Sequence, residues 1–228
     1  MIERVRIADI MTPADEVIFY DPAMEDECVK FCKNRNIEYL PSLEDPNNKA
    51  YCRSEKGFFE EITLDDSLKI DVNLDAFSEQ ALSKFKQNKV LFVYNYGEFC
   101  GIIHFSDYNN DKIKVYIYSI ILLYETSLRK ILRINNVKDL RNMDFEKHYI
   151  GELIDEISKN DNIKIKINNK DILRIFRNSI MHFHTTIRNK GVNVEEFIYD
   201  KNDFIIFTEN VNILMCEIRR VKTYILTK

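Results

Sequence analysis

The chain has 228 residues, of which 45% are hydrophobic and 31% are charged, a balance typical of ordinary globular proteins. Its five cysteines, an odd number, argue against a disulfide framework, and its most apolar run, residues 115–124, is too short to cross a bilayer. The opening residues lack the charged-then-apolar profile of a signal peptide, so we expect a cytoplasmic protein without a membrane partner.

The net charge of −4 is the sum of two unlike halves. Residues 1–110 carry 12 basic and 21 acidic side chains, whereas residues 111–228 carry 21 basic and 16 acidic ones. Within residues 159–190 the count is eight basic to two acidic. A local basic field attracts polyanions even on an acidic protein, but a solvated helix and a lysine-rich loop would give the same counts. Charge alone therefore leaves both interpretations open.

The first half alternates short apolar runs, typical of strands, with helical stretches. In chain order we expect a strand, a helix and two strands at residues 17–20, 24–35, 38–43 and 49–54. The same order returns at residues 69–72, 76–88, 90–94 and 99–105. The residues between the last two runs, 95–98, form a hairpin signal. Two β-α-β-β units of about 50 residues each predict an internal repeat and an α+β layer.

Cys28 and Cys32 are four residues apart on the first predicted helix, a spacing that in principle suits a metal ion. No second cysteine pair and no nearby histidine completes a site. We therefore interpret both thiols as small core residues and expect no metal.

From residue 111 onward the apolar residues recur at helical spacing instead. We expect four helices, at residues 113–132, 145–159, 171–189 and 204–226, with a lysine-rich loop at 160–169. The predicted architecture is α+β in residues 1–110, followed by an all-α four-helix bundle in residues 111–228.

Three segments of the first half carry a resemblance to a known family: Ala8–Pro13, Tyr39–Pro41 and Gly101–Asp107. They resemble the opening, the central strand and the closing element of CBS domains. A tandem pair of these domains is a regulatory module that commonly binds adenine nucleotides between its repeats. The resemblance implies that residues 1–110 sense an adenine nucleotide or a related small molecule.

In that family the closing element places an Asp on the ribose hydroxyls and a Thr on the phosphate. Asp107 matches the first position, whereas His104 replaces the Thr, and His104 with Ser106 could still meet a phosphate. The end of the first repeat, residues 50–54, keeps neither the Gly nor the Asp of the element, so at most one nucleotide site is expected. Asp107 could equally be the N-cap of a short helix that follows the strand.

Arg177 and His182 are five residues apart on the third predicted helix of the second half. A guanidinium can bind a phosphate through two N–H groups and stays charged, while an imidazole can move protons near neutral pH. The pair suits cleavage of a phosphodiester without a metal, although Arg and His also occur on helix surfaces without any function.

The order Arg177-Asn178-x-x-x-His182 resembles the catalytic motif of HEPN domains, which are four- or five-helix units. Their catalytic members are typically metal-independent endoribonucleases and toxins, connected with defence or growth arrest, that work as dimers. The resemblance implies attack of an RNA 2′-hydroxyl on its own 3′-phosphate, with His182 as general base or acid, Arg177 stabilising the transition state and Asn178 orienting the substrate. It implies no required cofactor.

Helix geometry complicates this assignment. At about 100° per residue, Arg177 and His182 point roughly 140° apart, so the two side chains would meet most easily across a homodimer. Arg177 and His184 lie within roughly 20° of each other, which makes His184 a rival catalytic residue.

Glu125, on the first helix of the second half, has two interpretations. It could restrain Arg177, as an acidic residue often does in the resembled family, or it could simply pair with Arg129 one turn away. We favour the simpler pair. The sequence as a whole predicts a ligand-regulated endoribonuclease. The alternative is a non-catalytic, dimeric module that senses adenine nucleotides.

Overall fold

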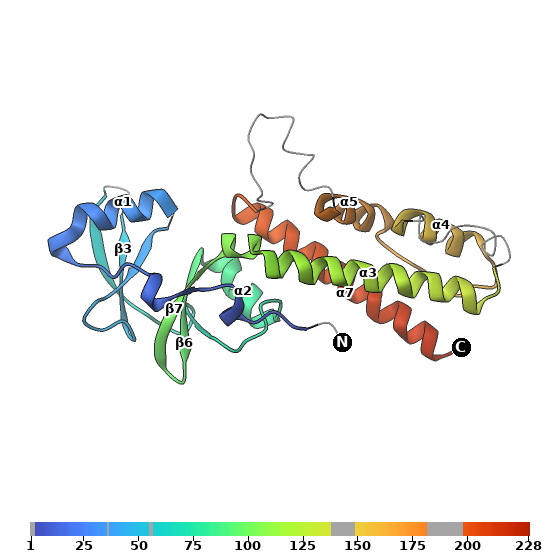
Figure 1. Cartoon of the computed structure of the whole chain (residues 1–228), viewed down its shortest axis with the longest axis horizontal. Coiled ribbons are helices and arrows are strands. Elements are labelled where there is room, and N and C mark those ends of the chain that lie inside the picture. Colours follow the sequence, from blue (N-terminus) through green and yellow to red (C-terminus); the bar gives the residue numbers. More distant parts are fainter. Residues whose placement is uncertain (1–2, 36, 55–56, 138–148, 182–197) are drawn as a thin grey trace, which may run out of the picture. The chain divides into compact units, whose positions relative to one another are not determined.

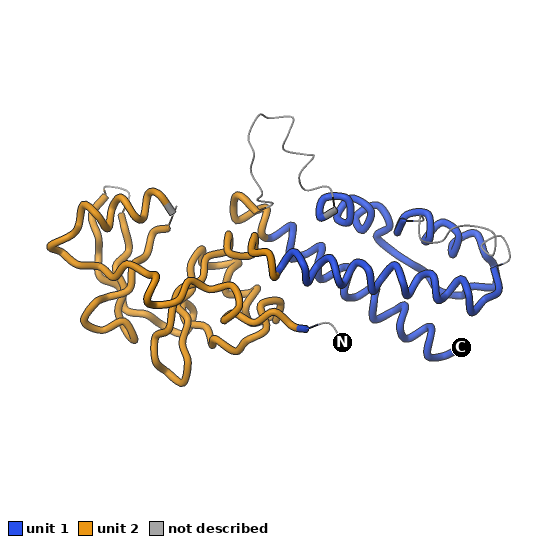
Figure 2. Tube along the Cα trace, in the orientation of Figure 1, with its two compact units in different colours: residues 1–3, 113–197, 205–228 blue, residues 4–112, 198–204 orange. Residues whose placement is uncertain are grey.

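The computed structural model describes residues 3–35, 37–54, 57–137, 149–181 and 198–228. The chain divides into two compact units (Figure 2). The sheet unit comprises residues 4–112 and 198–204, and the helical unit comprises residues 1–3, 113–197 and 205–228. The boundary expected at residues 110 and 111 lies close to this division, whereas residues 198–204 group with the sheet unit.

The sheet unit contains two separate sheets (Figure 1). Its strands are β1 (Thr12–Pro13), β2 (Tyr39–Pro41), β3 (Lys49–Arg53), β4 (Phe59–Thr63), β5 (Lys69–Asp71), β6 (Val90–Asn95) and β7 (Glu98–His104). One sheet has the order β1-β7-β6-β5, in which β5 and β6 run parallel and the other pairs antiparallel. The other is the antiparallel sheet β2-β3-β4. The fold is therefore mixed α+β.

Helices α1 (Glu25–Arg35) and α2 (Glu79–Gln87) belong to the same unit. The hydroxyl of Ser78 caps α2 by accepting a hydrogen bond from the backbone N–H of Ala81, and this cap fixes where the helix begins. One apolar core joins residues of both sheets, and Cys28 and Cys32 of α1 are fully covered within it. The two thiols are core residues, as expected.

The second predicted β-α-β-β unit is present as β5, α2, β6 and β7. The predicted hairpin lies between β6 and β7, where Tyr96 and Gly97 both have positive φ, as a tight two-residue turn requires. In the first unit, the expected strand at residues 17–20 is reduced to a single parallel bridge between Tyr20 and Ser42. The sequence did not reveal β1 and β4.

Strand β1 depends on the absence of a side chain at Gly101 of β7. A Cβ atom built there would lie 2.3 Å from the carbonyl oxygen of Thr12, far inside van der Waals contact. Thr12 pairs with Ile102 and Pro13 with Gly101 in this ladder. Glycine is therefore required at this position for the N-terminal segment to join the sheet.

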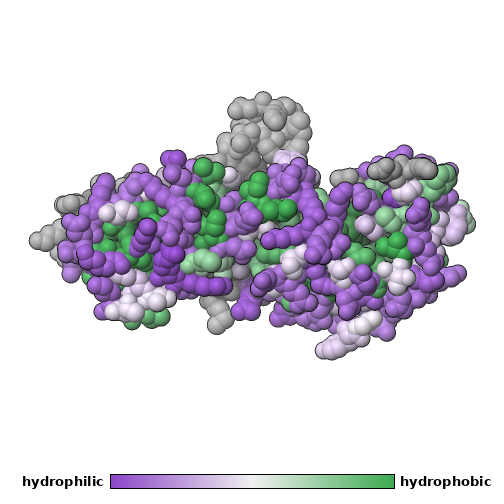
Figure 3. Space-filling view, turned by 180° about the vertical axis from the view of Figure 1, so that it is seen from behind, coloured by the Kyte–Doolittle hydropathy of each residue, from purple (hydrophilic) through white to green (hydrophobic). Residues whose placement is uncertain are grey.

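The helical unit contains α4 (Ile150–Lys159), α5 (Lys170–Met181) and most of α3 (Asp111–Ile134) and α7 (Lys201–Leu226). These helices correspond to the four that the periodicity predicts, although the expected continuation of the third through residues 182–189 lies outside the described residues. Their buried faces are mostly aliphatic and aromatic, as an amphipathic helix requires, and they also include a few charged side chains. None of the described helices combines the length and apolar character needed to span a membrane. The face in Figure 3 is mostly hydrophilic, with separate apolar patches.

Candidate functional site

The candidate site in the helical unit is built around Arg177 of α5. This helix buries Leu173 and Phe176, and Arg177 follows them on the inward side, so that its side chain is only 9% exposed. A buried guanidinium remains protonated and is stable only when neighbouring groups compensate its charge. Its surroundings therefore decide what it can do.

Three side chains hold the Arg177 guanidinium. Its Nε atom lies 3.6 Å from a carboxylate oxygen of Glu125 on α3. Its central carbon lies over the ring of Tyr149, 4.1 Å from the ring centroid. Its Nη1 donates a hydrogen bond of 3.2 Å to the amide oxygen of Asn178. These contacts fix the position and the orientation of the cation.

Glu125 contacts two arginines at once, so the pair favoured from the sequence is confirmed and the alternative contact is present beside it. The i,i+4 pair with Arg129 exists at 3.4 Å, but the same carboxylate also reaches Arg177. Glu125 is itself only 7% exposed. At 3.6 Å its contact with Arg177 is an ion pair rather than a hydrogen bond, because neither Arg177 Nε nor Glu125 Oε1 has a hydrogen-bond partner in the described part of the chain.

The histidines expected at this site, His182 and His184, lie outside the described residues. The structure thus brings together Arg177 and Asn178 from the expected catalytic set, together with Glu125. The structure adds Tyr149 to this set. Tyr149 had no separate role in the prediction from the sequence because it fell inside the helix predicted at residues 145–159. Tyr149 directly precedes α4, and its backbone N–H donates to the carboxylate of Glu152.

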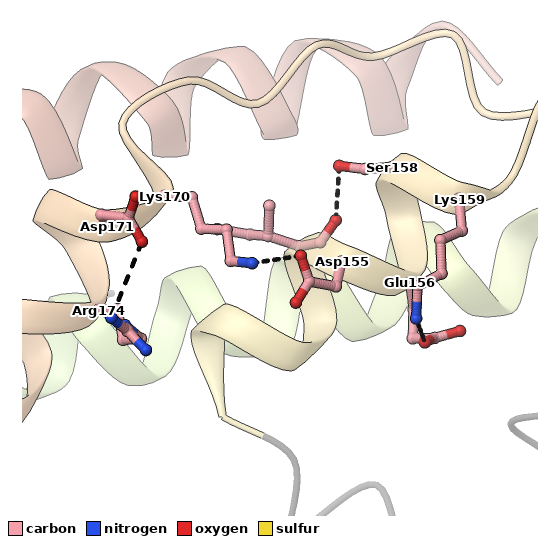
Figure 4. A network of polar contacts seen from close by, with 8 residues as sticks. Asp155, Glu156, Ser158, Lys159, Lys170, Asp171 and Arg174 are labelled. Carbon is pink, nitrogen blue, oxygen red and sulfur yellow. Dashed lines mark hydrogen bonds and ion pairs between the residues drawn. The ribbon is translucent and has the colours of Figure 1, made fainter.

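A row of basic residues continues from Arg177 along α5. Lys170, Arg174 and Arg177 are spaced by four and three residues, which places them on one side of a helix. The Lys170 ammonium pairs with Asp155 of α4, and Arg174 has Asp171 at 3.9 Å (Figure 4). This spacing is visible in the sequence itself. We call these three residues the α5 basic row.

Arg174 also explains a glycine inside α4. A Cβ atom on Gly151 would lie 3.3 Å from Cδ of Arg174, so the aliphatic stem of the arginine crosses the first turn of α4 closely. Tyr149 and Gly151 thus each contact an arginine of α5. The start of α4 therefore packs against the α5 basic row.

In the sheet unit, the residues expected to bind a nucleotide are tied to one another. The backbone N–H of His104 donates a 2.7 Å hydrogen bond to the carboxylate of Asp107. His104 is therefore the N-cap of the short helix that follows the strand, and Asp107 is its third residue rather than the expected N-cap. The hydroxyl of Ser106 lies 2.7 Å from Nδ1 of His104, and the backbone N–H of Ser106 also donates to this nitrogen. All three residues lie at the start of the short helix η4 (Phe105–Asn109).

Nδ1 of His104 must be an acceptor, since the backbone N–H of Ser106 can only donate. The neutral ring therefore carries its proton on Nε2, and this atom is buried without a hydrogen-bond partner among the described residues. Burial, with a smaller contribution from the nearby Lys89 ammonium and against the effect of Glu38, lowers the pKa of His104 from 6.5 to about 4. At neutral pH the ring is uncharged.

A second buried carboxylate in the helical unit was not anticipated. Glu217 of α7 is 2% exposed, and its Oε1 lies 2.8 Å from Nη1 of Arg220. Its Oε2 and the hydroxyl of Tyr124 on α3 are both buried without a hydrogen-bond partner in the parts of the chain described. Burial raises the pKa of Glu217, against the effect of Arg220 and of the Asn168 backbone N–H.

Among the described residues, no group of three or more His, Cys, Asp and Glu side chains is arranged to hold a metal ion. Lys164 and Lys166, in the basic loop between α4 and α5, are exposed. Comparisons with protein-family models, with curated proteins and with solved structures give no match to this chain.

Proposed function

We propose that the helical unit is a metal-independent endoribonuclease whose site is completed by a second copy of the chain. The observation that carries this proposal is the arrangement of Arg177, the first residue of the Arg-Asn-x-x-x-His order. Its charge is compensated and its direction is set by Glu125, Tyr149 and Asn178. A cation that is oriented before the substrate arrives is what stabilises developing charge on a phosphoryl group.

In the proposed reaction, the 2′-hydroxyl oxygen of RNA attacks the adjacent phosphorus and loses its proton to a histidine. The bond from phosphorus to the 5′-oxygen breaks, and this oxygen receives a proton. The products are a 2′,3′-cyclic phosphate and a 5′-hydroxyl end. His182, or its rival His184, transfers the protons, a role that contributes about 10²–10⁴-fold, while Arg177 stabilises the charged phosphorane.

A homodimer follows from the helix geometry of the motif. Because Arg177 and His182 point roughly 140° apart on an ideal helix, one copy supplies the cation and the other supplies the histidine. The Glu125 carboxylate holds Arg177 in place before RNA binds. The phosphate of the RNA then has to bind Arg177 beside Glu125 or displace this carboxylate.

For the sheet unit we propose regulation by an adenine nucleotide or a related small molecule. The order β5-α2-β6-β7 and the pairing of the N-terminal β1 with β7 support the likeness to a tandem CBS module. The Nε2–H of His104 is a buried donor without an acceptor among the described residues, and the Ser106 hydroxyl lies at the other ring nitrogen, Nδ1. Ligand control further requires that the ligand bind two states of the protein with different affinity.

The test is incubation of the purified protein with total RNA in the presence of EDTA, beside His182→Ala and His184→Ala. We expect cleavage by the wild type, and its loss in the His182 variant but not in the His184 variant. Loss only in the His184 variant would move the catalytic role to the rival residue. Absence of cleavage by the wild type, with and without adenine nucleotides, would contradict the proposal.

One observation favours a second candidate, a non-catalytic dimeric module that senses adenine nucleotides. Arg177 is only 9% exposed and already paired, which is also how a purely structural cation is arranged. In that case the wild type binds an adenine nucleotide in calorimetry but leaves RNA intact.

A further inference from the structure

The surface formed by Tyr149, the first turn of α4 and the α5 basic row offers groups that the proposed reaction does not use. Tyr149 is 54% exposed although Arg177 lies over its ring. An aromatic ring has two faces, and a guanidinium stacked on one of them leaves open surface for a second planar partner. Nucleic-acid bases are planar partners of this kind, and single-stranded RNA is commonly bound by stacking on aromatic side chains.

The charges along the row differ in how strongly they are paired. Lys170 pairs with Asp155, and Arg177 pairs with the buried Glu125. Among the described residues Arg174 pairs only with Asp171, at 3.9 Å, and the two side chains are 58% and 79% exposed. Such a distant pair in solvent contributes little, so the Arg174 guanidinium can exchange it for a phosphate at small cost.

The aliphatic stem of Arg174 also lies close to α4, although the side chain as a whole is 58% exposed. Its stem crosses Gly151, where a side chain would crowd Cδ at 3.3 Å. This contact directs Arg174 along the first turn of α4, the same turn that begins beside Tyr149. An aromatic ring, stacked on Arg177, and a weakly paired guanidinium therefore both lie at the start of α4.

We propose that Tyr149 and Arg174 form a subsite for one nucleotide of single-stranded RNA, adjoining the phosphate that is cut. The base stacks on Tyr149, and a phosphate of the same strand pairs with Arg174. This inference rests on the proposed ribonuclease function and adds to it a preference for unpaired RNA, because a base within a duplex has no free face for stacking. The stacking contact is tolerant of sequence, since every base has a planar face.

The experiment measures binding separately from cleavage. The probe is a fluorescein-labelled ten-nucleotide RNA of mixed sequence in which every 2′-hydroxyl is methylated, so that it cannot be cut through its own 2′-oxygen. Its dissociation constant is measured by anisotropy in EDTA at several salt concentrations. A duplex of the same strand is the second probe and is expected to bind more weakly.

Two substitutions test the stacking contact. Tyr149→Leu removes the ring, and we expect binding to weaken by about 5- to 100-fold, the range for loss of one aromatic–base stack. Tyr149→Phe keeps the ring and is expected to bind like the wild type. It tests whether the hydroxyl takes part, because phenylalanine keeps both the ring and its packing against the Arg177 guanidinium.

Arg174→Gln tests the phosphate contact, and Lys159→Gln is its matched control. Lys159 lies at the end of α4, is 71% exposed and pairs with Glu156 at 2.9 Å (Figure 4). Both variants lose one positive charge from this part of the surface. We expect only Arg174→Gln to weaken binding clearly and to reduce the logarithmic salt dependence by about 0.7, the value for one phosphate contact on a single strand.

The subsite is refuted if the wild type does not bind the methylated strand, or if Tyr149→Leu and Arg174→Gln bind it as well as the wild type. It is also refuted if Lys159→Gln weakens binding as much as Arg174→Gln, because the effect is then one of overall charge. Binding that depends on Tyr149 and Arg174, without cleavage of unmodified RNA, would retain the subsite and reject the ribonuclease. If the wild type cleaves unmodified RNA but Tyr149→Leu and Arg174→Gln bind the methylated strand normally, the ribonuclease is retained and the subsite is rejected.

Discussion

Arg177 Nε lies 3.6 Å from a carboxylate oxygen of Glu125, and both side chains are more than nine-tenths buried. Burial of this kind is costly for each ion alone and is tolerated only because the two compensate each other. Arg129 is a third member, since it reaches the same carboxylate from one turn along α3. The stability of the helical unit should therefore respond unequally to removal of the different members.

Glu125→Leu is predicted to cost more stability than Arg177→Met. The first substitution leaves two arginines without their shared carboxylate, whereas the second leaves Glu125 with Arg129. Removing one partner of a buried pair typically costs about 3–5 kcal/mol, and we expect Glu125→Leu to fall in that range and Arg177→Met below it. Urea unfolding followed by circular dichroism measures both values. Equal losses, or a smaller loss for Glu125→Leu, would show that the carboxylate is not shared.

The buried imidazole of His104 predicts a dependence of stability on pH. Its pKa is about 4 in the folded protein and 6.5 in an exposed chain, so between these values the unfolded state binds more protons. Lowering the pH through this window therefore removes stability, by up to about 3 kcal/mol in total. His104→Asn keeps an acceptor at the Nδ1 position and does not titrate. The wild type should lose more stability than this variant between pH 7 and pH 5, and parallel curves would contradict the burial of His104.

The buried carboxylate of Glu217 predicts a pH dependence of stability opposite to that of His104. Its pKa is raised in the folded state, so the folded protein binds more protons once the pH passes the ordinary carboxylate value of 4.5, and stability falls as the pH rises through this window. Glu217→Gln keeps an oxygen for the Asn168 backbone N–H and removes the buried charge. At pH 7 we expect this variant to be at least as stable as the wild type in urea. A marked loss of stability would mean that the charge itself is required.

Gly101→Ala tests the attachment of the N-terminal strand. The added methyl group meets the carbonyl oxygen of Thr12, and backbone cannot yield as a flexible side chain does. Overpacking of this kind typically costs about 1–3 kcal/mol, and here it should detach β1 from β7. Limited proteolysis is expected to cleave near residue 12 faster in the variant, while the neighbouring Cys100→Ala serves as the control. Equal cleavage rates would show that β1 pairs without needing the glycine.

The secondary structure of the second repeat and of the long helices could be predicted because local pattern determines it. Strands β6 and β7 are apolar runs around a turn with a glycine at positive φ, and α3 repeats its apolar residues at helical spacing. Strand β4 escaped prediction because its sequence, Phe59–Thr63, mixes charged and apolar residues, and it pairs only with β3 at the edge of its sheet. Strand β1 has only two residues, too few for any period.

Residues 198–204 belong to the sheet unit because of tertiary contacts, which a local sequence pattern cannot predict. Phe204 packs against Phe85 and Tyr108, with ring centroids 5.4 and 4.9 Å away. Asn109 exchanges two hydrogen bonds with the backbone of Ile198, 89 residues further along the chain. Helical periodicity predicts that Phe204 lies on the buried face of its helix, but it does not predict which of the two units that face packs into.

For the candidate site, the sequence identified Arg177, Asn178 and Glu125, and it correctly paired Glu125 with Arg129 but treated the contact with Arg177 as an alternative rather than a second contact. An i,i+4 pair is visible in the sequence, whereas contact with a different helix depends on how the helices pack. Glu217 did leave a signal, since it lies three residues after Leu214 and four before Val221, both of which are buried. Tyr149 left no such signal in the sequence, because its role depends on the packing of Arg177 against its ring.

The most direct test of the account is an end analysis of RNA treated with the purified protein in EDTA. A defined single-stranded RNA is compared with the same strand carrying one 2′-deoxy residue at the mapped cleavage position. The account predicts products with 2′,3′-cyclic phosphate and 5′-hydroxyl ends from the all-ribose strand, and no cut at the deoxy position. Cleavage at the deoxy position, or no cleavage of either strand, would contradict it.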